Sequence, residues 1–371
     1  MPGTRSVQPS GCADVRTAPV AVPYARPMAH GRRGQLTQRV LGSLPPGLDH
    51  VELRRDAARR LRGAVGDDVA VWAVLDPATL LWASCVVDGA DRDVDLENAV
   101  FDNEYRHRDV LSLRALAQGP LIGTLHQATA GAPADSARYR DVYRPRGITD
   151  ELRLVMHDGE TAWGALCLLR SGGTFAADEV AAVGELGRPF ARALRKSVVR
   201  PAATPDGDGA AGLLLASLDG RVLDVNPEAR RLLGDLDQVP QVVQAVAARR
   251  RAGAPASAAA PTPTGRWLAF HATELGPHLA VVVEQVRPPQ LADLVVRARG
   301  LTPRERAVLE LVARGLSNRR IAGQLGISEF TVGDHLKALF AKFDVGSRSE
   351  LVAALFFDHF APLHAAEGGA G

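Results

Sequence analysis

Four polar residues near the C-terminus follow one another at intervals of three. Ser328 and Thr331 come first, and Asp334 and Lys337 follow. The free amides at a helix N-terminus attract anions, so Ser328 and Thr331 suit a backbone phosphate. An aspartate accepts a hydrogen bond from the cytosine amino group, and a lysine donates to guanine O6 and N7. This spacing on a helix therefore predicts a face that contacts DNA in the major groove.

Residues typical of helix starts and ends place that helix in a bundle of four short helices over residues 301–356. Thr302-Pro303-Arg304-Glu305 is a capping box with proline at the first helical position, and Ser347 with Glu350 makes a second box. A single glycine turn separates the second helix from the third, as in a helix-turn-helix. Helix starts are expected at Thr302, Ser317, Ser328 and Ser347, helix ends at Gly315 and Gly326, and an inner stripe on the third helix at Val332, Leu336, Leu339, Phe340 and Phe343.

Residues 301–355 resemble the LuxR-type C-terminal helix-turn-helix domain of bacterial transcription regulators. The motifs are LTPRE, GLSNxxIA, IS-x-x-TV-x-x-H-L and V-x-SR-x-E-L-V, without gaps. The resemblance implies that Ser328 and Thr331 contact phosphate, while Gly333, Asp334 and Lys337 lie where the family contacts bases. Gly333 departs from the family, in which a long polar side chain is usual. The full expected DNA-binding set is Ser317, Asn318, Arg319, Arg320, Ser328, Thr331, Gly333, Asp334, Lys337, Lys342 and Arg348.

The charge balance predicts weak binding by one copy. Eight basic residues stand beside seven acidic ones within the segment, and the whole chain carries only +2. Non-specific affinity grows with the number of phosphates neutralised, so a homodimer on two half-sites is expected. In the family the fourth helix often pairs two copies. Here that helix either forms the dimer contact or simply covers the core, with Leu351, Val352, Leu355 and Phe356.

Length and cysteine content limit what the rest of the chain can be. A chain of 371 residues is expected to hold two or three domains. Its three cysteines, Cys12, Cys85 and Cys167, share no metal-binding spacing, which favours a reducing, cytoplasmic location without a disulfide framework or zinc site. No apolar run is long enough to span a bilayer. Residues 1–35 and 361–371 are expected to be disordered tails.

Residues 36–199 resemble a GAF sensor domain. Two predicted strand pairs, Val69–Leu75 with Leu80–Val87 and Glu151–His157 with Thr161–Arg170, are flanked by helices, and Phe175–Ser197 closes the unit as one helix. The best match is the ending GETAWGALCLLRSGGTFAADEVAAVGELGRPFARAL. The resemblance implies a ligand pocket between the sheet and the variable helices, with Trp82, Tyr105, His107 and His126 as candidate contacts.

Residues 213–287 resemble the start of a PAS domain through SLDGRVLDVNPEARRLLG, after a linker at 200–212. Asn226 is expected to cap a helix, and Ala252 to Gly265 is interpreted as an Ala/Pro low-complexity insertion. No residue resembles a haem or flavin ligand, so no cofactor is expected and the unit is interpreted as a spacer and dimer surface. A linker helix at 288–300 is expected to transmit the signal to the DNA-binding domain at 301–360.

The predicted fold class is multidomain α+β, with GAF-like and PAS-like α/β sensor domains before an all-α four-helix LuxR-type domain. The sequence contains no G-x-S-x-G, Walker or HExxH motif, so no enzyme is expected. We expect a cytoplasmic transcription regulator whose partners are double-stranded DNA, a second copy, an unidentified small-molecule or protein signal and, as an open possibility, RNA polymerase. The alternatives are a redox-active GAF-type thiol protein, using Cys85 or Cys167, and a sensor that acts mainly through protein contacts.

Overall fold

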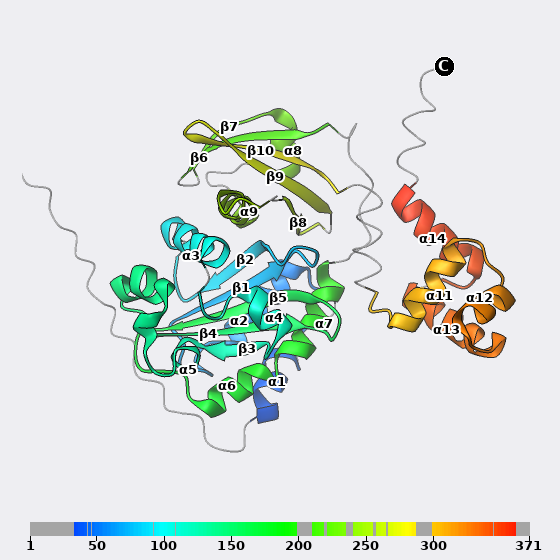
Figure 1. Cartoon of the computed structure of the whole chain (residues 1–371), viewed down its shortest axis with the longest axis horizontal. Coiled ribbons are helices and arrows are strands. Elements are labelled where there is room, and N and C mark those ends of the chain that lie inside the picture. The colour runs from blue at the N-terminus through cyan, green and yellow to red at the C-terminus, as the bar shows by residue number, and fades with distance from the viewer. Residues whose placement is uncertain are drawn as a thin grey trace, which may run out of the picture.

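The computed structural model describes residues 33–360, apart from 43, 46, 92, 108, 199–209, 219–220, 235–239, 255–256, 265, 287–298 and 344. Two five-stranded antiparallel sheets and a C-terminal group of helices make up this part of the chain (Figure 1). The expected tails at 1–35 and 361–371, the linker at 200–212 and the linker helix at 288–300 lie wholly or mainly outside the described residues.

The first sheet has the strand order β2-β1-β5-β4-β3. Both hairpins predicted from the sequence are confirmed, because β1 pairs antiparallel with β2 and β4 pairs antiparallel with β5. The central β5 pairs with both β1 and β4, which brings the two hairpins into one sheet. The strands are β1 (Val69–Leu75), β2 (Trp82–Asp88), β3 (Ile122–Thr124), β4 (Asp150–His157) and β5 (Ala162–Arg170).

Helices cover both faces of this sheet. On one face α2 packs against β1 and β2, and α7 packs against β4 and β5. Side chains alternate along β1, so Trp72 faces these helices while Val71 faces the opposite side. The helices of the two faces are α1 (Arg33–Leu41), α2 (His50–Leu61), α6 (Ala177–Gly184) and α7 (Gly187–Val198) on the first, and α3 (Val94–Arg106) and α4 (Leu113–Gln118) on the second.

Shorter elements lie between α4 and β4. The helix α5 (Leu125–Ala128) follows β3, and a π-helical turn, Tyr139–Tyr143, lies between the 3-10 turns Pro133–Asp135 and Arg144–Arg146. The single closing helix expected at 175–197 is wrong in detail. It is broken at Glu185 and Leu186 into α6 and α7, which lets the second half turn onto β4 and β5.

The second sheet has the order β7-β6-β10-β9-β8. The Asn226 cap is confirmed, since its side chain accepts the Ala229 amide at 2.8 Å. The low-complexity interpretation of Ala252 to Gly265 is wrong for Ser257–Pro261, which pairs with β9 as an edge strand. The elements are β6 (Gly212–Ser217), β7 (Val222–Val225), α8 (Pro227–Leu233), α9 (Gln241–Arg251), β8 (Ser257–Pro261), β9 (Trp267–Leu275) and β10 (His278–Gln285).

The helix α9 lies between the two sheets (Figure 1). It contacts α3 and β2 on one side and β9 on the other. Seven consecutive residues from Val242 to Ala248 are buried, because a helix enclosed on all sides has no solvent face. Arg251 at its end pairs with Asp102 of α3 at 2.7 Å. The second sheet is thus joined to the α3 side of the first.

The C-terminal helices form a separate apolar core. The inner residues Val332, Leu336, Leu339 and Phe343 are buried together with Val308 and Ile321. Predicted Phe340 packs only partly against this core. The helices are α11 (Pro303–Ala313), α12 (Asn318–Leu325), α13 (Glu329–Phe343) and α14 (Arg348–Phe360). Within the described ranges, the structure has no helix with the length and apolar character that a bilayer crossing requires.

Candidate nucleic-acid interface and an apolar cavity

The caps predicted from the sequence set the start and end of the helices around α13. Thr302 and Glu305 form the expected capping box on α11. Gly315 and Gly326 adopt φ of +79° and +66°, the left-handed conformation that glycine accepts without strain. At the start of α13 the Ser328 hydroxyl accepts the Thr331 amide at 3.0 Å and lies 2.8 Å from the Thr331 hydroxyl. Both hydroxyls therefore lie together at the positive end of the helix.

The outer face of α13 is exposed to solvent. Lys337 Nζ donates to Asp334 Oδ1 at 3.2 Å, and the two side chains remain 76% and 50% exposed. On the opposite, inner face of α13, Leu336 and Leu339 are buried. The helix is therefore anchored by one side and presents the opposite, polar side outward.

Gly333 lies at the edge of that outer face. A Cβ at this position would meet no heavy atom within 4 Å. No neighbouring side chain therefore requires glycine, and α13 loses one potential base contact together with the helix propensity of a larger residue.

The second helix supplies further exposed cations. Arg319 and Arg320 at the start of α12 are both exposed. Ser317 occupies the position before this helix, but its side chain makes no capping hydrogen bond, so the predicted Ser317 cap is correct in place and wrong in mechanism.

Three residues of the predicted set bind within the domain instead of projecting from it. Lys342 Nζ donates to Glu305 Oε2 at 2.5 Å and to the Gly300 carbonyl at 2.9 Å. Arg348 donates to Asn318 Oδ1 at 3.0 Å and to the Leu316 carbonyl. Lys342 and Arg348 each tie two helices of the bundle together, so both predicted DNA contacts have partners within the domain.

Phe330, in the first turn of α13, was not among the residues expected to contact DNA. Its side chain is 77% exposed, on a helix whose other large apolar residues are buried or half-buried. The available signal was an apolar residue two positions before Val332, where the inner stripe of the helix predicts a solvent-facing position.

A cavity of about 290 Å³ lies between the first sheet and α3. Trp82, Cys85 and Val87 of β2 and Leu96, Val100 and Phe101 of α3 line it. Trp82 and Phe101 meet edge to face with ring centroids 5.4 Å apart. Trp82 Nε1 is buried and has no hydrogen-bond partner among the residues that the structure describes. The wall is mainly apolar, and this indole N–H belongs to one of the residues that line it.

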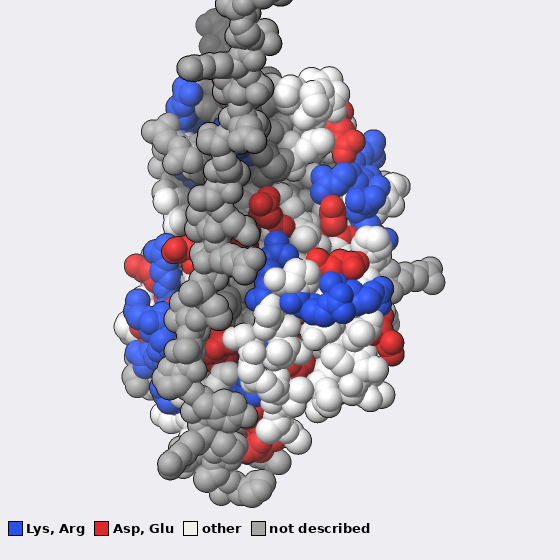
Figure 2. Space-filling view, turned by 90° about the vertical axis from the view of Figure 1, so that its left-hand side faces the viewer, with Lys and Arg blue, Asp and Glu red and all other residues white. Residues whose placement is uncertain are grey.

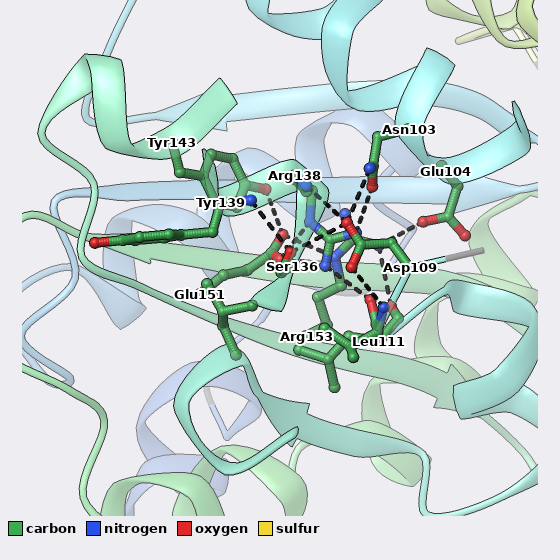
Figure 3. A network of polar contacts seen from close by, with 12 residues as sticks. Asn103, Glu104, Asp109, Leu111, Ser136, Arg138, Tyr139, Tyr143, Glu151 and Arg153 are labelled. Atoms are coloured by element: carbon green, nitrogen blue, oxygen red, sulfur yellow. Dashed lines mark hydrogen bonds and ion pairs between the residues drawn. The ribbon is translucent and has the colours of Figure 1, made fainter. Parts of the chain in front are cut away.

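Glu151 and Arg153 line this cavity and belong to a buried polar network that also contains Arg138 (Figure 3). Arg138 and Arg153 both contact Glu151, at 2.9 Å and 2.7 Å. Arg153 also pairs with Glu104 at 2.5 Å. Burial by itself raises the pKa of the Glu151 carboxyl, but the two arginines outweigh that effect and hold this pKa below its ordinary value.

The remaining hydrogen bonds of this network come from neighbouring loops and helices. The Tyr143 hydroxyl donates to Glu151 at 2.7 Å, and Asp109 accepts from the Arg138 amide at 2.7 Å and from Asn103 at 2.9 Å. Arg138 donates through all three guanidinium nitrogens, to Glu151, Asn103 and the Val110 carbonyl. Arg153 donates through Nε and Nη1, to Glu151, Glu104 and the Leu111 carbonyl, so the network fixes this side of the cavity wall.

The four predicted ligand contacts do not share one site. Trp82 lines the apolar cavity. Tyr105 and His107 line a second, polar cavity of about 290 Å³, although the Tyr105 hydroxyl also accepts the Trp82 amide at 3.2 Å. His126 is exposed on α5 and lines neither of these cavities. Of the four, Trp82 and Tyr105 are joined by a hydrogen bond, and Tyr105 and His107 share the polar cavity.

The thiol groups give little support to redox chemistry. Burial raises the pKa of the Cys167 thiol to about 12, so the reactive thiolate is scarce at neutral pH. Cys85 lines the apolar cavity and is half-buried. Cys12 lies outside the described residues.

Charges of both signs share the surface drawn in Figure 2. Lys and Arg side chains are interspersed with Asp and Glu over the described residues that are visible in that view. This mixture agrees with the small net charge of the chain, +2. A broad electrostatic footprint for nucleic acid is therefore missing from the visible, described part of this face.

Comparisons with known proteins match the C-terminal helices. The family described as "Bacterial regulatory proteins, luxR family" matches residues 299–355. A putative HTH-type transcriptional regulator of Aeromonas salmonicida is 49% identical over 59 residues, which are 16% of this chain and 30% of that protein. The nitrate/nitrite response regulator NarL of Escherichia coli is 50% identical over 50 residues, 14% of this chain and 23% of its own length.

A NarL homologue of Haemophilus influenzae is 53% identical over 60 residues, 16% of this chain and 27% of its own. The chain thus spans less than a third of the length of these relatives. Among solved structures, the phage VqmA–DPO complex covers 47% of this chain and 95% of its own at 18% identity, with a TM-score of 0.17 that is too low to indicate a shared fold. Residues 299–355 therefore form a LuxR-type helix-turn-helix domain, the DNA-binding domain of bacterial transcription regulators.

Proposed function

We propose that the whole chain is a sequence-specific transcription regulator that contacts bases through Asp334 and Lys337 of α13. The observation that carries this proposal is the exposed pair on the outer face of a helix whose inner face is buried. Asp334 would accept from cytosine and Lys337 would donate to guanine. Ser328 and Thr331 suit one phosphate at the helix N-terminus, and Arg319 and Arg320 suit neighbouring phosphates.

Two copies on two half-sites are the form that this charge distribution favours. With Lys342 and Arg348 bound inside the domain, one module offers few cations to the duplex. Few neutralised phosphates give low affinity, and a pair of modules on one operator adds their contacts. In the proposed dimer, each copy would make these contacts at its own half-site, and the two half-sites would lie one helical turn apart.

For the front of the chain we propose a sensing role, and the apolar cavity beside α3 is the best candidate site. Its volume of about 290 Å³ suits a small molecule, and its wall consists mainly of branched and aromatic side chains. The unpartnered Trp82 N–H would select a ligand that carries one hydrogen-bond acceptor. The GAF-like and PAS-like assignments of the two sheets belong to the same proposal.

The DNA-binding proposal is tested with an operator selected by the full chain from random duplexes. Lys337→Ala and Asp334→Ala should each lower the ratio of operator to non-specific affinity by roughly 5- to 150-fold, because each good base contact is worth about 1–3 kcal/mol. Lys196→Ala, which removes an exposed lysine on α7, is the matched control and should leave the ratio unchanged. If the protein selects no duplex, or if both variants keep the wild-type ratio with an intact fold, the proposal is wrong.

A further inference from the structure

Phe330 is the most exposed of the large apolar side chains in the described part of the chain. It is 77% exposed, and Leu275 is the next at 61%. An aromatic ring in water at the start of a short helix contributes nothing to the core of the domain. A role for the Phe330 ring therefore depends on the surface residues around it.

The ring lies on the same helix face as the two proposed base contacts. Phe330, Asp334 and Lys337 stand at positions i, i+4 and i+7 of α13, opposite the buried inner stripe. Phe330 belongs to the first turn, and the N-terminal residues of a recognition helix are those that contact base edges.

Gly333 leaves room beside the ring. It follows Phe330 by three residues, and a Cβ there would meet no heavy atom within 4 Å. The ring is thus flanked by an open position on one side and by charged, exposed Asp334 and Lys337 along the helix. Charged residues are depleted at the cores of protein interfaces, so this surrounding favours a polar groove over an apolar protein partner.

We propose that Phe330 contacts the C5 methyl group of a thymine and so helps to specify the operator. The proposal rests on the DNA-binding function above and adds an apolar base contact to the polar ones. The thymine methyl is the one apolar group on the major-groove edge, and phenylalanine is among the side chains that contact it. A glycine at position 333 keeps the path to that methyl open.

The test replaces thymine by uracil, which removes only the methyl group, at each A·T pair of the selected operator in turn. For the wild-type chain, uracil at one position of each half-site should weaken binding about fourfold. This is the effect of losing the burial of one methylene-sized group. Phe330→Ala should bind thymine and uracil operators equally at that position. Phe330→Leu, which keeps an apolar side chain, should retain part of the discrimination.

Lys337→Ala is the matched control, since it should weaken operator binding while preserving the thymine-to-uracil ratio. Circular dichroism should be the same for Phe330→Ala and the wild type, because an exposed side chain supports no packing. A wild type that binds its operator and is indifferent to every uracil replacement overturns the role of Phe330 and leaves the DNA-binding function standing. Equal thymine-to-uracil ratios for wild type and Phe330→Ala also overturn it, whereas a chain that selects no duplex overturns both proposals.

Discussion

Asp334 and Lys337 bind each other in the free protein, so each must exchange a partner to contact a base. The pair joins exposed side chains three residues apart on one helix at 3.2 Å. Such pairs stabilise a helix by about 0.2–0.5 kcal/mol. A specific base contact is worth about 1–3 kcal/mol, so the exchange favours DNA. The intrahelical pair therefore does not prevent the proposed base contacts.

Gly333 gives a prediction at a single position. Gly333→Ala should raise the free energy of unfolding of the helical domain by about 0.5–1 kcal/mol, because alanine loses less backbone entropy and its Cβ meets open space. Urea unfolding of the full chain, followed by far-UV circular dichroism, measures the change. Gly326→Ala is the matched control on a residue with φ of +66°, and it should cost about 1 kcal/mol. Equal effects at both positions would contradict this account of Gly333.

At the scale of elements, Lys342 joins α13 to the start of α11. Its ammonium contacts the Glu305 carboxylate at 2.5 Å. Burial by itself raises the pKa of Glu305, but hydrogen bonds from Lys342 and Thr302 outweigh it and hold the pKa below the ordinary value of 4.5. A carboxyl whose pKa is lower in the folded state stabilises the fold above its unfolded pKa. That stability is lost as the pH falls through the folded pKa.

Lys342→Met should therefore lower the free energy of unfolding by about 2 kcal/mol at pH 7, since a partly buried charge-assisted hydrogen bond is lost. The difference from wild type should shrink steadily as the pH falls below 4.5, because protonated Glu305 no longer needs the ammonium. Urea unfolding at pH 7 and at pH 3.5 measures both values. Lys337→Met, on the exposed side of the same helix, should change stability by less than about 0.5 kcal/mol at either pH. An equal loss for Lys342→Met at both pH values would contradict the link to Glu305.

Local signals predicted those elements that carry their own start and stop residues. The capping box at Thr302, the glycine ends and the alternating hairpins all depend on neighbours in sequence, and the structure confirms them. The strand Ser257–Pro261 was missed because alanine has little strand preference, and its place is set by pairing with β9. The orientation of Lys342 was likewise unpredictable, since its partner Glu305 lies 37 residues away.

The wall of the apolar cavity likewise depends on contacts between residues that are far apart in the sequence. Arg153 and Glu104 are 49 residues apart in sequence and pair at 2.5 Å only because the fold brings the last turn of α3 beside β4. A buried charge must find a partner, but the sequence does not say which one. The four aromatic and histidine candidates chosen from residue type therefore fell at different places, and only Trp82 lines the apolar cavity.

Across the whole molecule, β4 connects the cavity to the DNA-binding helices. Glu151 and Arg153 of β4 line the cavity, and the turn after β4 carries Glu160. Glu160 pairs with Arg306 of α11 at 3.0 Å. In the same turn Asp158 accepts from Arg195 at 2.8 Å, and the Arg195 guanidinium lies directly beside Gly300. The strand β4 and the turn after it thus link the cavity wall to α11, which offers one physical route for coupling the two sites.

A filled cavity should therefore alter DNA binding in the full chain. Val100→Phe places a larger side chain in the cavity, and we expect operator affinity to change at least fivefold, the lower bound of common coupling energies. Adding Glu160→Gln should reduce that change, because the contact from the β4–β5 turn to Arg306 is weakened. Leu223→Phe, at an exposed position on β7, is the control and should leave affinity unchanged. Fluorescence anisotropy with the selected operator measures all four proteins. A folded Val100→Phe variant whose affinity stays within twofold of wild type would exclude this cavity as the sensing site.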